Sequence, residues 1–115
     1  GLVLFGCQMA VKTVDTYIAK IYMVGPIEVA KQVLRRYSLT YGACFTVDPI
    51  DDIYTDGEEV GYVVGLINHP RFSKTYVEIF DEATTVANLL LAETHQHSYS
   101  IVAMDRTNWF TRRES

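Results

Sequence analysis

Apolar and polar residues alternate along several short segments of the chain, and this period of two predicts β-strands. Prolines, glycines and short polar runs separate these segments, as is usual at strand ends. The expected strands are Tyr17–Val24, Gly42–Asp48, Val60–Ile67, Lys74–Phe80 and Tyr99–Met104.

Two other segments repeat apolar residues at helical spacing. The first helix is expected to follow Gly25-Pro26, because proline suits a helix start, and to run to about Tyr37. The second is expected to begin after Asp81 as N-cap and to end near Glu93. The residues predicted to face the core are Ile27, Ala30, Val33, Leu34 and Tyr37 in the first helix, and Ala83, Val86, Ala87 and Leu90 in the second.

The order β-α-β-β-β-α-β predicts an α+β fold, a ferredoxin-like (PII-like) split βαβ sandwich. Two helices cover only one face of such a sheet, so the other face would present Tyr, Phe and Val side chains to water. We therefore expect the chain to be oligomeric through the sheet. The predicted domain spans residues 17–105, preceded by a leader or extension at 1–16 and followed by a C-terminal tail at 106–115.

Composition narrows the class of protein. The chain has 115 residues, 49% of them hydrophobic, which is enough for one packed domain. The net charge of -4 argues against nucleic acid as a partner, and no apolar run is long enough to predict a membrane span. The two cysteines, Cys7 and Cys44, lack metal-site spacing, and Cys44 is expected to be buried.

The segment 48–59 is acidic and contains neither Lys nor Arg. Tyr54 lies within it and Tyr62 follows it. Carboxylates can hold an ammonium group or ribose hydroxyls, and a tyrosine ring can hold adenine or a sulfonium cation. The alternative is a solvated loop whose acids only keep the protein in solution. The carboxylates are Asp48, Asp51, Asp52, Asp56, Glu58 and Glu59.

Other chemistry-bearing residues give weaker signals. Glu93 opposes the negative end of the second helix dipole, so it is either exposed or retained for a ligand. His95 and His97 provide only two metal ligands, so we expect a surface turn and no metal site. The sequence contains no nucleophile elbow and no phosphate-binding glycine loop.

From Thr40 onward the chain resembles the phage S-adenosylmethionine lyases, long called S-adenosylmethionine hydrolases. The resemblance covers most of residues 17–105, and it depends on the order and spacing of short matching pieces. These are Tyr41-Gly42, Gly61-Tyr62, Lys74-Thr75-Tyr76-Val77, the helix Ala83–Ala92 and the strand Ile101-Val102-Ala103.

The resemblance implies a phage counter-defence enzyme that destroys S-adenosylmethionine in the cytoplasm of the infected bacterial host. The implied products are methylthioadenosine and homoserine lactone, with no cofactor and no metal. The family's fold is similar to trimeric PII-type signalling proteins, which implies a homotrimer with sites between subunits. We predict that Glu58, Glu59 and Tyr62 are catalytic, and that Tyr41, Tyr54, Tyr76 and Glu93 bind the substrate.

The implied chemistry agrees with the lack of a catalytic triad. The sulfonium is already a good leaving group, and the substrate's own carboxylate can attack its γ-carbon to close a lactone ring. The enzyme then has only to hold the methionine tail in an attack geometry. Two alternatives stay open: a PII-like trimer that binds an adenine nucleotide without catalysis, and a structural phage protein with no small ligand.

Overall fold

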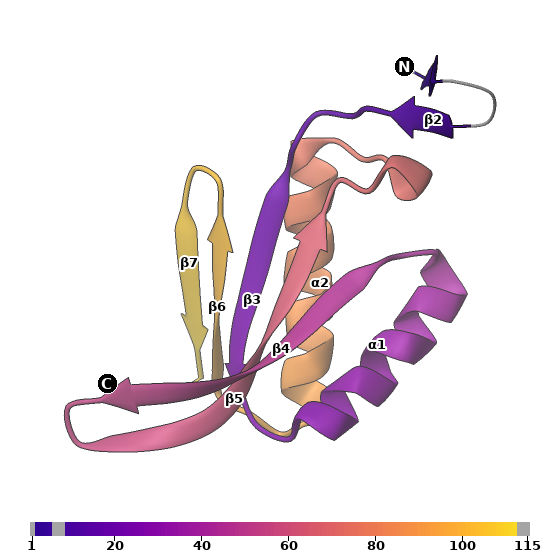
Figure 1. Ribbon diagram of the computed structural model, residues 1–115. Helices are drawn as coiled ribbons and strands as arrows, with labels where there is room; N and C mark the ends of the chain where they lie inside the picture. The colour runs from indigo at the N-terminus through magenta and orange to yellow at the C-terminus, as the bar shows by residue number, and fades with distance from the viewer. Residues whose placement is uncertain (1, 6–8, 113–115) are drawn as a thin grey trace.

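The computed structural model describes residues 2–5 and 9–112. Its elements form a two-stranded sheet, a five-stranded sheet and two α-helices (Figure 1). In chain order they are β1 (Leu2–Phe5), β2 (Met9–Lys12), β3 (Ile18–Val24), α1 (Ile27–Tyr41), β4 (Phe45–Tyr54), β5 (Gly57–Ile67), the 3₁₀ turn η1 (Pro70–Phe72), α2 (Tyr76–Glu93), β6 (Ser98–Ala103) and β7 (Thr107–Thr111).

The main sheet is antiparallel throughout and has the strand order β4-β5-β3-β6-β7. Without β7, the elements from β3 to β6 follow the β-α-β-β-α-β order of a split βαβ domain. The predicted α+β class is therefore confirmed, and the architecture is compatible with a ferredoxin-like fold. The element order differs from the prediction, because one expected strand is part of a helix.

Both helices lie on the same side of the main sheet (Figure 1). The inward side chains of β3, β5 and β6 pack against the apolar faces of α1 and α2, as predicted for both helices. The opposite sheet face has no covering element among the described residues, and it exposes large side chains. These are Ile18, Tyr22, Ile67, Val102 and Trp109.

Helix α1 has the start that the sequence predicts. Pro26 occupies the N-cap with extended backbone angles, which is compatible with its ring. The helix continues one turn past the predicted end at Tyr37. It stops at Gly42, whose φ of 67° lies in the left-handed region and whose N–H donates to the Ser38 carbonyl at 2.9 Å.

The prediction of a strand at Lys74–Phe80 is wrong, because Tyr76 begins α2. Thr75 is the N-cap: its hydroxyl accepts from the Glu78 N–H, and the Glu78 carboxylate accepts from the Thr75 N–H. This reciprocal capping box satisfies two backbone donors that a helix start leaves unpaired. Asp81, the expected N-cap, lies one and a half turns inside the helix.

The acidic segment is not a loop. It forms the outer half of the β4–β5 hairpin, whose strands pair continuously from Phe45↔Leu66 to Tyr54↔Gly57. Thr55 and Asp56 alone connect the strands, and a two-residue loop is among the commonest hairpin connections. The acids therefore have defined directions, which alternate between the two faces of the ladder.

Three further expectations concern the chain ends and the cysteines. The predicted tail at 106–115 is partly a strand, because β7 pairs with β6 and extends the sheet beyond residue 105. The expectation that Cys44 is buried is wrong, because Cys44 is exposed in the turn before β4. Cys7 lies outside the described residues. No helix in the described ranges is long and apolar enough to cross a bilayer.

Candidate functional site

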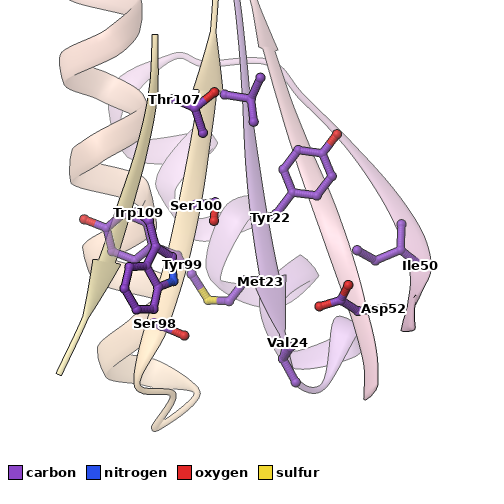
Figure 2. Close-up of a pocket in the computed structure, with 11 residues that line it drawn as sticks. Tyr22, Met23, Val24, Ile50, Asp52, Ser98, Tyr99, Ser100, Thr107 and Trp109 are labelled. Carbon is purple, nitrogen blue, oxygen red and sulfur yellow. The ribbon is translucent and has the colours of Figure 1, made fainter. Parts of the chain in front are cut away.

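A hollow of about 390 Å³ opens on the sheet face that the helices leave bare (Figure 2). Strands β3 and β6 pair only as far as Tyr22↔Ser100 and then diverge. The gap between them exposes the buried layer below, where Met23 and Tyr99 form the floor. The hollow is lined by Tyr22, Met23, Val24, Ile50, Asp52, Ser98, Tyr99, Ser100, Val102, Thr107 and Trp109.

The lining combines aromatic rings, hydroxyl groups and one carboxylate. Trp109 stands on one side of the hollow, and Tyr22 and Asp52 stand on the other (Figure 2). None of the lining residues that the structure describes is Lys or Arg. Such a surface favours a ligand with flat rings and positive charge, and it offers nothing to neutralise a phosphate.

Gly61 keeps one part of this face free of side chains. It pairs with Val24 on β3 and with Ile50 on β4, both of which line the hollow. A Cβ atom at Gly61 would lie 2.4 Å from the Met23 carbonyl oxygen, so any other residue would push β5 away from β3. The glycine therefore allows the close strand approach that positions Val24 and Ile50.

The outer half of the β4–β5 hairpin adds a second carboxylate on the same face. Asp52 pairs directly with Glu59 across the two strands, and the Tyr54 hydroxyl donates to Glu59 Oε1 at 2.8 Å. Glu58 pairs with Ile53 and therefore lies on the opposite face of the hairpin. Of the two glutamates predicted to be catalytic, Glu59 is the one that shares a face with the hollow.

Tyr62 lies beneath the hollow and is fully buried. Its hydroxyl donates to the Met23 sulfur at 3.2 Å, and burial raises the pKa of Tyr62 to about 12. Tyr62 thus supports the Met23 floor from the core side. A direct catalytic contact from Tyr62 would require its hydroxyl to leave Met23 and pass the floor.

The remaining predicted residues lie elsewhere in the single chain. Tyr41 and Glu93 line a separate hollow of about 230 Å³ between α1 and α2. Tyr76, at the start of α2, packs edge-on against Tyr17 with ring centroids 5.9 Å apart, and its hydroxyl donates to Asp105. The chain therefore brings Tyr54 and Glu59 together, and Tyr41 and Glu93 together, but it does not collect all seven residues in one site.

Comparison with solved structures gives an independent view of the fold. The fold resembles that of a phage SAM lyase. A phage SAM lyase in complex with S-methyl-5'-thioadenosine matches with a TM-score of 0.68 and 14% sequence identity, over 86% of this chain and 93% of that chain. A phage SAM lyase in the apo state matches with a TM-score of 0.55 and 14% identity, over 86% and 91% of the two chains. No protein-family model matches the sequence, and no curated protein matches it by sequence.

These matches confirm the resemblance to phage SAM lyases at the level of the fold. They cover 86% of this chain, so the similarity extends over most of the described fold and not over one motif. At 14% identity, however, side chains have to be judged from this chain's own geometry.

Sequence reasoning missed three residues of the hollow. The sequence predicts Tyr22 only as part of an alternating strand and Asp52 as one acid among several, and it favours packing of Trp109 on the sheet or a neighbour over ligand binding. Trp109, Ser100 and Tyr22 form one cross-strand row, which depends on the register of three strands. The sequence gives no clear signal for the β6–β7 hairpin, because Thr107–Thr111 does not alternate apolar and polar residues and no glycine or asparagine stands in the turn at 104–106.

Metal ligands do not gather at the hollow. Within residues 2–5 and 9–112, no three His, Cys, Asp or Glu side chains come close enough to hold a metal ion. Asp52 and Glu59 are paired across β4 and β5, and neither forms an ion pair with a described Lys, Arg or His.

Proposed function

We propose that this protein cleaves S-adenosylmethionine into methylthioadenosine and homoserine lactone. The observation that carries the proposal is the charge and shape of the hollow. Its described lining has aromatic rings and one carboxylate but no Lys or Arg, on a fold that resembles a protein solved with methylthioadenosine. S-adenosylmethionine carries a sulfonium and an ammonium, so both of its positive groups suit this surface. The adenine ring suits Trp109 or Tyr22 as a stacking partner.

The proposed reaction balances without a cofactor, a metal or a proton transfer. A carboxylate oxygen of the substrate forms a bond to the substrate's own γ-carbon, and the bond from that carbon to sulfur breaks. The sulfur keeps the electron pair and becomes the neutral thioether of methylthioadenosine, and the amino acid part leaves as the lactone. Holding the tail in this geometry can supply on the order of 7–11 kcal/mol of the barrier in favourable cases.

Asp52 and Glu59 are the carboxylates that we propose to hold the ammonium or the ribose hydroxyls, with Tyr54 orienting Glu59. Two like charges opposite each other on an antiparallel ladder destabilise a sheet, so a cationic ligand would relieve their repulsion. Tyr62 acts in this proposal as a positioning residue through Met23. Glu58 remains a second candidate, on the other face of the hairpin.

We further propose a homotrimer with sites between subunits. The support is the uncovered sheet face, where Trp109 is 66% exposed and Ile67 50% exposed. Tyr41, Tyr76 and Glu93 bind substrate in this proposal only where a neighbouring copy brings them to the hollow. Tyr41 is 67% exposed, so it is accessible for such a role.

An adenine-nucleotide regulator of the PII type is the alternative. Nucleotide phosphates are usually held by Lys, Arg and glycine-rich backbone. The described lining of the hollow has no such cation and includes Asp52, so it favours a cationic ligand over a polyphosphate.

Turnover and ligand charge test the proposal together. The purified protein is incubated with S-adenosylmethionine, and methylthioadenosine is followed by chromatography. In parallel, calorimetry compares three ligands: S-adenosylmethionine, ATP and S-adenosylhomocysteine, whose sulfur is an uncharged thioether. We expect methylthioadenosine to form and the sulfonium ligand to bind best. ATP binding without turnover would support the regulator instead.

A further inference from the structure

The outer half of the β4–β5 hairpin carries an apolar patch on its helix-side face. Ile53 is 75% exposed and Val60 is 65% exposed. They are diagonal neighbours, because Ile53 pairs with Glu58 and Val60 pairs with Asp51. Figure 1 shows that this half of the hairpin projects beyond both helices, and the high exposure of Ile53 and Val60 means that none of the described residues covers the patch. We call Asp51, Ile53, Glu58 and Val60 the hairpin patch.

An apolar groove of about 580 Å³ lies between α1 and the edge strand β4. Leu39, one of its lining residues, is 88% exposed, more than any other large apolar side chain in the described part of the chain. The two charged residues that line the groove, Lys31 and Arg35, are both cationic. Lys31 already forms an ion pair with Glu28 at 3.3 Å, whereas Arg35 has no ion pair with any residue that the structure describes. The residues of this α1–β4 groove are Lys31, Leu34, Arg35, Ser38, Leu39, Phe45 and Val47.

We propose that the hairpin patch of one copy of this chain binds in the α1–β4 groove of a second copy. The apolar pair Ile53 and Val60 would leave water against the leucine, phenylalanine and valine side chains of the groove. The flanking acids of the patch would meet the cations of the groove, with Arg35 as the unpaired partner. Opposite charges around an apolar centre also reject wrong orientations of the two copies.

The contact has to be between copies, because one chain cannot make it alone. In Figure 1 the projecting end of the hairpin points away from α1. The groove residues of β4, Phe45 and Val47, lie near the start of the strand, whereas Ile53 lies near its far end, about six residues or 20 Å along it. Each copy therefore gives one patch and receives another in its groove. Such head-to-tail contacts close into a ring when the rotation between copies permits it. The contact is compatible with the proposed trimer, and it does not depend on the proposed reaction.

Charge reversal and its repair test this pairing. Light scattering at micromolar concentration measures the mass of the wild type, Arg35→Glu, Glu58→Arg and the double variant, against a chain mass of 13.0 kDa. We expect the wild type at a multiple of that mass, both single variants at the chain mass, and the double variant restored. Arg71→Glu, a charge reversal at an exposed site in η1 away from the groove, should keep the wild-type mass.

Ile53→Ser gives a second variant that changes no charge, and it should also reduce the mass to that of one chain. Circular dichroism checks that every variant is folded. A monomeric wild type would overturn the proposal. Single variants that keep the wild-type mass would also overturn it, because they would exclude the contact. A folded double variant that stays monomeric would exclude the pairing of Arg35 with Glu58. If every variant keeps the wild-type mass, the copies associate through the bare sheet face alone and the proposed contact is wrong.

Discussion

Replacing Glu59 by Gln should separate function from stability more cleanly than any other change in the hairpin. Gln keeps the shape of the side chain and removes its charge. In the folded chain Glu59 accepts the Tyr54 hydroxyl at 2.8 Å and stands directly opposite Asp52. The substitution therefore removes one of two facing carboxylates and leaves an acceptor for Tyr54.

The expected effects on the fold and on turnover have opposite signs. Like charges opposite each other in a sheet cost about 0.2–1 kcal/mol, so Glu59→Gln should leave the free energy of unfolding unchanged or raise it slightly. A charge-assisted hydrogen bond to the substrate contributes about 1.5–3 kcal/mol, so its loss should slow turnover about 10- to 150-fold. A residue retained for structure alone would not give this combination.

The assay measures methylthioadenosine formation and urea unfolding for Glu59→Gln, with Asp81→Asn as an acid-to-amide control at an exposed position in α2. Glu58→Gln, on the opposite face, should lose less activity than Glu59→Gln. The two variants are compared only where light scattering gives them the same assembly mass, so that a change in assembly does not affect the comparison. Wild-type turnover in a folded Glu59→Gln variant would refute the reasoning, and a larger loss in Glu58→Gln would show that the wrong face was chosen.

Three further predictions follow from particular contacts. Trp109→Ala should weaken S-adenosylmethionine binding roughly 2- to 13-fold in calorimetry, the equivalent of an aromatic contact of about 0.5–1.5 kcal/mol; unchanged affinity would remove Trp109 from the site. Thr75→Ala breaks the capping box of α2 and should lower the free energy of unfolding by about 0.5–2 kcal/mol in urea, whereas Thr85→Ala, exposed in the same helix, should not. Burial raises the pKa of Tyr62 from 10.0 to about 12, so between these values the unfolded chain ionises first. The free energy of unfolding should therefore fall as pH rises through this window, by about 2–3 kcal/mol from Tyr62, and a folded Tyr62→Phe variant that falls equally steeply would contradict this cause.

Much of the fold could be predicted because local pattern and tertiary packing agree. Ala83, Val86, Ala87 and Leu90 repeat at helical spacing and are all fully buried. The error at Lys74–Phe80 arose where the two signals conflict. Val77 and Ile79 are β-branched and alternate with Tyr76 and Glu78, a pattern that fits a strand. The Thr75–Glu78 capping box instead starts a helix, whose buried face begins at Ile79.

Only those parts of the candidate site that are close together in the sequence could be predicted. The acidic segment and Tyr54 were visible in the sequence, and the Tyr54–Glu59 contact joins residues five apart. Which acid faces the hollow depends on strand pairing, because a shift of one residue moves a side chain to the other face. The row of Trp109, Ser100 and Tyr22 joins three strands, and no local pattern determines that register.

The most direct test of the central claim follows the oxygen atoms of the reaction. The protein is incubated with S-adenosylmethionine in water labelled with heavy oxygen, and the amino acid product is trapped early and examined by mass spectrometry. If the substrate's own carboxylate attacks, the first product is unlabelled homoserine lactone, released in equal amount with methylthioadenosine. Homoserine with heavy oxygen on its γ-hydroxyl from the earliest time points would show attack by water and contradict the account, as would the lack of any methylthioadenosine.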